Sequence, residues 1–438
     1  MDQIAGPSLS ETVSWQAMRA QAARICAKPS RRALEGAAIE WTRRTPMVTR
    51  RQAALVVGAA FRSFGAERET DRVRLYRVPN RGIQPQMALD DTGTLHLVYY
   101  TGDAHHGDLF YTRSKDGGAS FSSTLRVNKG GTAIAAGTIR GAQLALGKRS
   151  GAHVAWNGSN DIGPLNPDSG KPGAPMLYAR LNDAGDAFEP ERNLMLHSFG
   201  LDGGGSIGAN RSGDVYVTWH GLGPFEAKGT GKEGEARRRV WVTKSADNGK
   251  TFSDEAKAWD QETGACGCCG MKTFVNRKGD VFALYRSATE SVHRDIYFLY
   301  STDRGRTFQG KLLHKWNINA CPMSSMDFAE NGDILVCAWE TGGQIYWTRI
   351  TGGRTGEPSA APGEGRGRKH PRLAVNVKGE VLLIWTEGTG WQKGGSLAYQ
   401  LYDPAGRPST EIKMLPGIPT WSFAAAVPMP DNIFSILY

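Results

Sequence analysis

Short apolar runs and polar turns alternate along most of the chain. Residues 86–100 are representative and read QMALDDTGTLHLVYY: an apolar stretch, a polar turn with glycine, and a second apolar stretch ending in aromatics. Such runs bounded by turn residues predict β-strands. Helix-forming residues are not concentrated anywhere after residue 70. The sequence therefore predicts an all-β fold.

The two-strand unit of residues 86–100 recurs along the chain. Six further copies begin at Ala142, Ser206, Lys272, Ser325, Arg372 and Ser422, at spacings of about 47 to 66 residues. Repeats of this length are typical of propeller blades. The last copy holds only two strands, and the alternating segment Arg72–Val78 is expected to complete it. We predict a seven-bladed β-propeller whose last blade is closed by N- and C-terminal strands, with six blades as the alternative.

A second motif, Ser-x-Asp-x-Gly-x-x-Phe, follows several copies of the unit. It is complete around Asp116, Asp247 and Asp303, and a degenerate copy without the serine surrounds Asp183. The Asp and Ser side chains of such a motif hydrogen-bond their own turn backbone. The motif resembles the Asp box of the sialidase-like (neuraminidase-like) propellers, also called the BNR repeat, and the resemblance covers about residues 70–438. It implies the fold and a structural turn rather than an activity.

Charge is concentrated in the N-terminal segment. Residues 1–66 carry a net charge of +6, against +10 for all 438 residues. The twin arginine Arg50-Arg51 precedes a short apolar run at residues 53–61, which is typical of a bacterial twin-arginine export signal. We interpret residues 1–46 as a non-native extension, 47–66 as the export signal and 67–438 as the propeller. A cytoplasmic helix is the alternative for the N-terminal segment.

These features set the expected location and partners. An export signal implies a bacterial protein that is periplasmic or extracellular. The apolar run is shorter than the ~20 residues that a membrane span needs, so no span is expected. The propeller region carries no basic stripe, so no nucleic-acid partner is expected either. We expect a monomer that binds a small molecule or a glycan.

Strand direction predicts which residues share the functional face. Strands alternate in direction within a blade, so residues before each first strand and after each second strand lie on one face. The first group comprises Gln84, Arg140, Asp202, Cys266, Cys268, Cys269, Cys321, His370 and Trp421. The second group comprises Asp103, His105, His106, Asn157, His220, Arg286, Glu290, Glu340, Glu387 and Trp391. We predict that these polar residues converge on an axial pocket.

The cysteines allow three hypotheses. Cys266, Cys268 and Cys269 precede blade four, and Cys321 precedes blade five. In an exported protein a disulfide from the triplet to Cys321 is one possibility. A copper or zinc site is the second, with His370 and any of the histidines 105, 106 and 220 as further ligands. A reactive thiol pair is the third.

Two further points bear on the metal hypothesis. The Cys-x-Cys-Cys spacing is tighter than the usual zinc spacing, which favours a copper-type or multinuclear site. Cys337 lies inside an apolar strand and is expected to be a buried core thiol, while Cys26 lies in the N-terminal extension.

The sialidase resemblance implies a carboxylate-binding arginine trio, a Tyr–Glu nucleophile pair and an Asp acid/base. Candidate residues at the predicted mouth are Arg140 and Arg286 for a carboxylate, Asp103 as acid, and Glu340 or Glu387 as the group that orients a base or nucleophile. Candidate substrate contacts are Gln84, His106, His220 and Trp391. The segment Tyr76-Arg77-Val78-Pro79 has the spelling of the first-arginine motif of the family. It is out of register, because that arginine is expected near position 84.

Three functions follow from these candidates. The first is an exported sialidase-like propeller that binds or acts on a carbohydrate at the axial pocket, as an exo-sialidase-like glycoside hydrolase does. The second is a copper- or thiol-dependent oxidoreductase built on the four clustered cysteines and His370. The third is a non-catalytic binding propeller.

Overall fold

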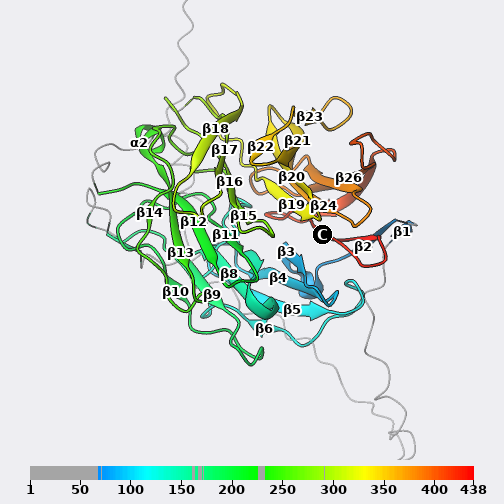
Figure 1. Ribbon diagram of the computed structural model, residues 1–438, viewed down its shortest axis with the longest axis horizontal. Coiled ribbons are helices and arrows are strands. Elements are labelled where there is room, and N and C mark those ends of the chain that lie inside the picture. The colour runs from blue at the N-terminus through cyan, green and yellow to red at the C-terminus, as the bar shows by residue number, and fades with distance from the viewer. Residues whose placement is uncertain are drawn as a thin grey trace, which may run out of the picture. The chain divides into compact units, whose positions relative to one another are not determined.

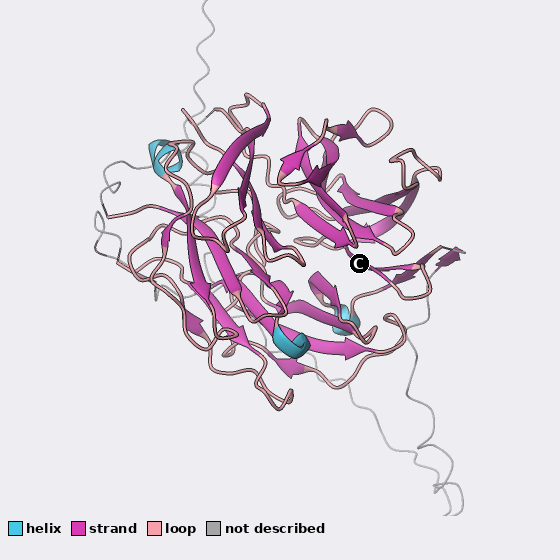
Figure 2. Cartoon of the chain, in the orientation of Figure 1, coloured by secondary structure: helices cyan, strands magenta, loops and turns pink. Residues whose placement is uncertain are grey.

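A computed structural model describes residues 68–70, 72–159, 163–165, 170, 172–224, 232–290 and 292–438. These residues form seven β-sheets (Figures 1 and 2). The short helix α2 (Lys232–Arg237) is the one α-helix in this part of the chain. No helix among the described residues is long and apolar enough to cross a membrane. The predicted extension 1–46 and export signal 47–66 lie outside the described residues, as does Cys26.

Each blade is a sheet of hydrogen-bonded neighbouring strands. Blade one holds β3 (Ile83–Leu89), β4 (Leu95–Gly102), β5 (Gly107–Ser114) and β6 (Leu125–Arg126). Blade two holds β7 (Gln143–Leu146), β8 (Ala152–Asn157), β9 (Met176–Arg180) and β10 (Arg192–Asn193). Blade three holds β11 (Ser206–Ala209), β12 (Val215–Gly221), β13 (Arg239–Ser245) and β14 (Ala256–Lys257). Blade four holds β15 (Lys272–Val275), β16 (Val281–Arg286), β17 (Ile296–Ser301) and β18 (Gln309–His314).

The remaining blades follow the same plan. Blade five holds β19 (Asp327–Asn331), β20 (Ile334–Thr341), β21 (Gln344–Thr351) and β22 (Arg354–Thr355), with β23 (Ser359–Ala360) also paired to β21. Blade six holds β24 (Arg368–Val375), β25 (Val381–Glu387), β26 (Gly395–Tyr402) and β27 (Lys413–Ile418). Blade seven holds β28 (Ala425–Pro428), β29 (Phe434–Leu437), β2 (Val73–Tyr76) and β1 (Arg68–Thr70).

The first strands of the seven blades form a closed ring around the axis. Contacts run in sequence through β3, β7, β11, β15, β19, β24 and β28, and β28 contacts β3 again. The predicted seven-bladed propeller is therefore confirmed, and the six-bladed alternative is wrong.

Blade seven joins the two ends of the described chain. β2 pairs with β29 in parallel, with Val73 opposite Phe434 and Tyr76 opposite Leu437. Val73 and Leu75 are 1% exposed, because both pack against the neighbouring blade six. The predicted closure by N- and C-terminal strands is thus confirmed. It leaves the strand β29 without a free edge, which removes a site for unwanted strand pairing.

Aromatic residues at the ends of the repeat units fill the space between blades. Four tryptophans occupy equivalent places in the second strands of blades two, three, five and six, and each is at most 1% exposed: Trp156, Trp219, Trp339 and Trp385. Large aromatic side chains bury ~150–250 Å² each and dominate core energetics. The repeated aromatic in the sequence is therefore a packing signal.

The Asp boxes have the expected turn geometry. In blade one, Ser114 donates to Asp116 (Oγ to Oδ1, 2.7 Å), and the backbone N–H of Ser120 donates to the same carboxylate at 2.8 Å. Asp247 and Asp303 make the equivalent bonds to Ser245 and Ser301, both at 2.7 Å.

The degenerate copy in blade two differs. Asn182 Oδ1 accepts from the backbone N–H of Gly185 at 2.8 Å, so Asn182 holds the turn. Asp183 instead lies 3.2 Å from Arg180 in an ion pair. The expected turn role of Asp183 is corrected accordingly. Without the serine, the asparagine one residue earlier supplies the turn acceptor.

Candidate functional site

The cysteine triplet lies in a loop that is hydrogen-bonded to two blades at the predicted face. The backbone N–H of Cys266 donates to the carbonyl of Arg286 at the end of β16 (2.9 Å). The N–H of Gly270 donates to the carbonyl of Ser324, which precedes β19 in blade five (3.0 Å). The loop is therefore fixed to its own blade and to the next one.

The fold brings four of the cysteines together. Cys266 and Cys268 place their sulfurs 3.3 Å apart, and those two and the Cys269 sulfur all lie within 4.8 Å of one another. The Cys268 thiol also interacts with the thiol of Cys321, as predicted for blades four and five. All five described cysteines are free, so the disulfide hypothesis finds no bond here. Cys337 is fully buried in β20, as expected.

Two ion pairs of buried arginines border the cysteine cluster. Arg286 Nη2 lies 2.9 Å from Glu340 Oε2, and both side chains are at most 3% exposed. Arg294 Nη2 lies 2.8 Å from Glu235 Oε2. The positive charge of Arg286 helps to lower the pKa of the Cys269 thiol.

These arginines retain hydrogen-bonding capacity. A third guanidinium, that of Arg238, lies 3.6 Å from both Asp202 and Glu235. Several buried guanidinium nitrogens have no hydrogen-bond partner among the described residues: Arg238 Nε and Nη1, Arg286 Nε, and Arg294 Nε and Nη1. Buried donors without partners are costly and usually mark a missing ligand or solvent. The surroundings of the thiols therefore favour a negatively charged group.

The thiols differ in acidity. Burial raises the pKa of Cys269, but hydrogen bonds from Cys266 and Cys268 and the charge of Arg286 outweigh it, so the net pKa lies well below the usual thiol value. The pKa of Cys268 is raised, chiefly because its proton is held toward Cys266. A hydrogen bond from Cys268 lowers the pKa of the exposed Cys321 to about 7. One thiolate is thus stabilised inside the cluster and another at its rim.

Two predicted histidines are buried near the cluster. His220 Nε2 lies 3.4 Å from the Cys269 carbonyl, and its Nδ1 has no partner in the described residues. His370 Nδ1 lies 3.3 Å from Ser325 Oγ. Burial lowers the pKa of His220 to about 4 and that of His370 to about 3. Both imidazoles are therefore neutral at pH 7, which is the form that binds metals.

The predicted residues of the β4–β5 loop are exposed instead. Asp103, His105 and His106 lie at the surface, and Asp103 accepts the backbone N–H of His105 at 2.9 Å. This hydrogen bond is the largest cause that lowers the Asp103 pKa. Asp103 is thus stabilised as an anion, which is the opposite of what a general acid requires.

The other hydrolase candidates are held by structural partners. Arg140 donates to Asp202 Oδ1 at 2.6 Å, and Glu387 accepts from Arg368 Nε at 3.0 Å. Burial raises the pKa of two tyrosines at this end of the blades, Tyr100 and Tyr285. Their hydroxyls bond to the Asp103 carbonyl and to Thr263, not to a glutamate. The Tyr–Glu pair of a sialidase does not form from them.

Of the remaining predicted substrate contacts, Gln84 has a structural role and Trp391 is exposed at the surface. Gln84 is buried and its Nε2 donates to the carbonyls of Ala135 and Trp421, both at 2.7 Å, so it links neighbouring blades. Trp391 is 55% exposed, and its ring meets that of Trp421 edge-on with centroids 4.7 Å apart. Arg77 donates to the Gly417 carbonyl at 2.6 Å, in the outer part of blade six, which agrees with the out-of-register reading of its motif.

The larger cavities lie on the other face. Two cavities at the predicted face measure about 10 Å³ each, because Gln84, Gly270 and Trp421 crowd the axis there. The axial channel opens instead among the β-turns of the opposite face, with a volume of about 500 Å³. The expected roomy axial pocket beside the cysteines is corrected accordingly.

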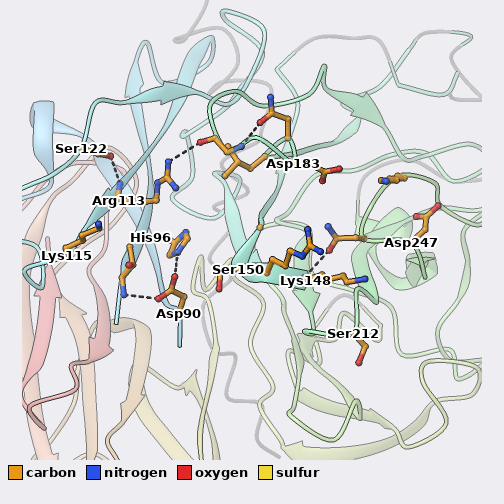
Figure 3. Close-up of a pocket in the computed structure, with 18 of the residues that line it drawn as sticks. Asp90, His96, Arg113, Lys115, Ser122, Lys148, Ser150, Asp183, Ser212 and Asp247 are labelled. Atoms are coloured by element: carbon orange, nitrogen blue, oxygen red, sulfur yellow. Dashed lines mark hydrogen bonds and ion pairs between the residues drawn. The ribbon is translucent and has the colours of Figure 1, made fainter. Parts of the chain in front are cut away.

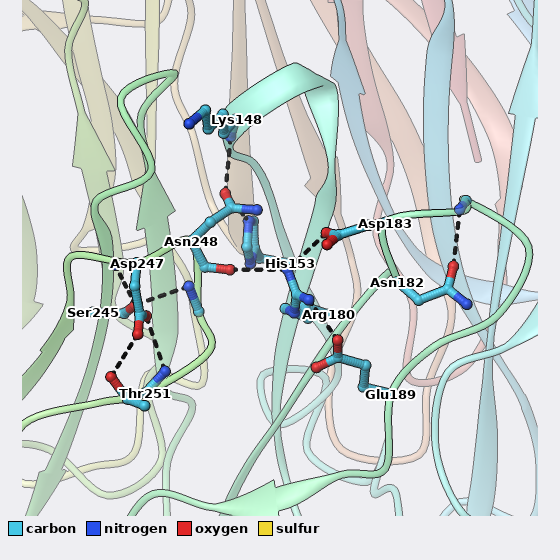
Figure 4. Close-up of polar contacts among 12 residues, drawn as sticks. Lys148, His153, Arg180, Asn182, Asp183, Glu189, Ser245, Asp247, Asn248 and Thr251 are labelled. Atoms are coloured by element: carbon cyan, nitrogen blue, oxygen red, sulfur yellow. Dashed lines mark hydrogen bonds and ion pairs between the residues drawn. The ribbon is translucent and has the colours of Figure 1, made fainter.

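A pocket of about 970 Å³ also lies on the Asp-box side, between blades one, two and three (Figure 3). Asn248 lines this pocket, and Figure 4 shows the polar contacts around it. Asn248 Oδ1 accepts the backbone N–H of Lys148 at 3.0 Å and lies 3.3 Å from His153 Nε2. Sequence reasoning missed this pocket because it treated the Asp-box turns as structural only.

No protein-family profile and no curated protein matches the chain. Solved structures with a similar arrangement include a Hadza microbial sialidase, with 12% identity, 70% of this chain covered and a TM-score of 0.45. A protein of unknown function from Dyadobacter fermentans has 15% identity, 79% coverage of this chain, 97% of that chain and a TM-score of 0.48. The fold itself is a seven-bladed β-propeller. The propeller spans 63% of the length of the Hadza sialidase. Likenesses this distant carry no argument about its activity.

Proposed function

We propose that the propeller binds a soft metal ion, copper(I), at the thiols of Cys266, Cys268 and Cys269, with Cys321 at the rim. The observation that carries this proposal is the gathering of three cysteine sulfurs within 4.8 Å of one another. Bound copper would supply one-electron chemistry, so the function is that of a copper- or thiol-dependent oxidoreductase.

The sulfur spacing suits a shared ion. Thiolates bind soft or borderline metals at ~2.3 Å, so two thiolates on one ion lie at most ~4.6 Å apart. The three sulfurs lie within 4.8 Å of one another, so a closure of at most a few tenths of an ångström is needed. The 3.3 Å contact between Cys266 and Cys268 already lies inside that limit.

Charge and ligand softness favour copper(I) over zinc. Several thiolates around one monovalent ion leave a net negative complex, and the unpartnered N–H groups of Arg238, Arg286 and Arg294 are placed to offset it. Soft thiolate ligands select copper(I). The neutral imidazole of His220, with its free Nδ1, is available as a further ligand.

The proposal includes export. The twin arginine Arg50-Arg51 and the following apolar run support delivery of the folded propeller to the periplasm or beyond. Replacing both arginines with lysine is expected to retain the protein in the cytoplasm, which fractionation of the producing cells measures. Unchanged export of that variant would contradict the signal.

The metal site is tested by loading the full chain with copper(I) without oxygen and measuring copper per chain. We expect at least one tightly held ion in the unaltered protein. Cys268→Ser is expected to abolish binding, because Cys268 contacts both Cys266 and Cys321. Cys337→Ala is the matched control, since it removes a buried thiol of β20 and is expected to retain full loading.

Two results would overturn the copper proposal. Equal copper in Cys268→Ser and the unaltered protein would place the ion elsewhere. If copper(I) fails to displace bound zinc, the cluster is a structural zinc site and not a copper site.

A second candidate function, carbohydrate binding, is favoured by one observation. Trp391 is a large aromatic that is 55% exposed at the cysteine face, braced edge-on by Trp421. Exposed aromatic faces stack on sugar rings. Binding rather than hydrolysis is expected, because Arg140 and Glu387 are held by structural partners.

Glycan binding at this position is tested by screening an oligosaccharide panel against the propeller and its Trp391→Ala variant. We expect at least one glycan whose affinity falls about tenfold in the variant, the loss of one stacking contact of ~1.4 kcal/mol. Release of sialic acid from a fluorogenic sialoside would show that the hydrolase hypothesis holds after all.

A further inference from the structure

The 970 Å³ pocket on the Asp-box side has an excess of positive charge (Figure 3). Five cationic side chains line it, against three carboxylates: Arg113, Lys115, Lys148, Arg149 and Lys250, and Asp90, Asp183 and Asp247. A volume near 1,000 Å³ is at the upper end of the usual range for small-ligand sites. The pocket is therefore large enough for an oligomeric ligand of several rings.

None of the three carboxylates forms an ion pair with these cations in the described part of the chain. Asp90 accepts from the backbone and hydroxyl groups of its own turn, at 2.7 to 2.9 Å. Asp247 is bonded by Ser245 and Thr251. Asp183 pairs with Arg180, outside the set of lining residues. Each carboxylate thus already interacts with groups of its own turn or with Arg180.

By contrast, four of the five cationic side chains have no bonding partner in the described part of the chain. The side chains of Lys115, Lys148, Arg149 and Lys250 are exposed and make no hydrogen bond or ion pair among the described residues. Four like charges around one hollow repel one another unless an anion lies between them. The pocket is electrostatically complementary to a negatively charged ligand.

Two of these cations are presented by a strained turn. Arg149 and Ser150 have φ values of 54° and 59°, in the left-handed region that non-glycine residues avoid. The equivalent turns of blades three and six place glycines, Gly213 and Gly379, in that region. Strain of this kind persists only where the surrounding structure holds it, and it clusters at functional sites. Blade two is also the blade whose Asp box is degenerate, so both departures from the repeat border the same pocket.

The polar lining points to a sugar as the carrier of the charge. The hydroxyls of Ser150 and Ser212 line the pocket and have no hydrogen bond among the described residues. The two aromatic residues of the lining are His96 and Phe121. His96 is buried and bonded to Tyr111 and Asp90, so it offers no stacking platform for a nucleic-acid base.

We infer that the Asp-box side of blades one to three is a second binding site, for an anionic oligosaccharide bearing sulfate or carboxylate groups. Lys148 and Arg149 are its central charges. Lys115 and Lys250 contact further anionic groups along the chain, and serine hydroxyls contact the sugar. This site is separate from the cysteine cluster and does not depend on the metal proposal.

The test is a titration of the full chain with dextran sulfate oligomers, with neutral dextran and inorganic polyphosphate in parallel. We expect dextran sulfate to bind with an affinity that falls as salt rises, because salt screens exposed charges. Lys148→Glu/Arg149→Glu is expected to weaken binding at least about tenfold. Lys278→Glu/Lys378→Glu is the matched control, since it makes the same charge change in exposed turns outside the pocket and is expected to alter affinity less than about twofold.

A second variant separates binding from folding. Arg149→Asn/Ser150→Gly installs residues that adopt this turn readily, so its melting temperature is expected to rise while dextran sulfate binding weakens. Equal binding by neutral dextran, or equal weakening in the control pair, would overturn the site. Tighter binding of polyphosphate than of dextran sulfate would contradict a sugar ligand and show that the site recognises negative charge alone.

Discussion

At the scale of single residues, equivalent positions in the repeat have diverged in role. Asp116, Asp247 and Asp303 each accept the hydrogen bonds of their own turn. Asp183 occupies the matching place in the sequence but pairs with Arg180. Sequence spacing alone cannot separate these cases, because the substitute acceptor, Asn182, is recognisable only once its bond to Gly185 is known.

This divergence predicts different costs for the same substitution. Asp247→Ala is expected to lower the free energy of unfolding by about 1 kcal/mol, because it removes bonds to Ser245 and Thr251. Asp183→Ala is expected to change it by less than about 0.5 kcal/mol, since the Asp183 carboxylate is exposed and Arg180 keeps its ion pair with Glu189. Urea unfolding of both variants measures the difference. Equal costs would show that Asp183 supports its turn after all.

The buried His153 leads to a prediction about how the stability of the protein depends on pH. Burial lowers the pKa of His153 to about 4, against ~6.5 in an unfolded chain, while Asn248 raises it and the charges of Arg180 and Glu189 act in opposite directions. The unfolded state therefore binds a proton first as the pH falls. His153 is expected to cost up to about 3 kcal/mol of stability between about pH 6.5 and pH 4, with no cost above that range.

The measurement is urea unfolding at several pH values for the unaltered protein and His153→Gln. The difference between the two is expected to vary with pH only below about 6.5. A constant difference down to pH 4 would contradict the buried, neutral imidazole.

At the scale of strands and blades, pattern reasoning succeeded where the repeat carries the information. Alternation, turn residues and aromatic positions gave the blade count, and the leftover strand at Arg72–Val78 gave the closure. The same reasoning grouped the four cysteines, because first-strand starts share a face. It failed on the axial pocket, since the packing of Gln84 and Trp421 beside the axis leaves no trace in residue spacing.

Closure by β2 predicts a large cost for a small change. Leu75 is 1% exposed between blades six and seven, so Leu75→Ala is expected to cost about 3 kcal/mol of unfolding free energy. Leu75→Met conserves volume and is the control, with a cost below about 1.5 kcal/mol. Urea unfolding compares the two. Similar losses in both variants would show that the strand is sensitive to shape rather than to burial.

At the scale of the whole molecule, the two faces of the propeller carry different chemistry. One face gathers thiols among buried arginines, and the other carries exposed lysines around a broad hollow. The candidate partners of the cysteines, such as Arg294 and Glu235, were not predicted, because they lie on a loop and on α2 rather than at repeat positions.

A tightly bound ion stabilises the whole ring by mass action. Copper(I) at 100 times its dissociation constant is expected to stabilise the propeller by ~2.7 kcal/mol, while Cys268→Ser shows no gain. Thermal unfolding with and without copper(I) measures this. A gain of the same size in Cys268→Ser would show that copper binds outside the cluster.

The parallel pairing of β2 with β29 also bears on the order of folding. Most strand pairs join neighbours in sequence, whereas this one joins residues as distant as Val73 and Phe434. Closing so long a loop costs chain entropy before any contact repays it. Individual blades can therefore assemble early from local contacts, and sealing of the ring is expected to be the late, rate-limiting step.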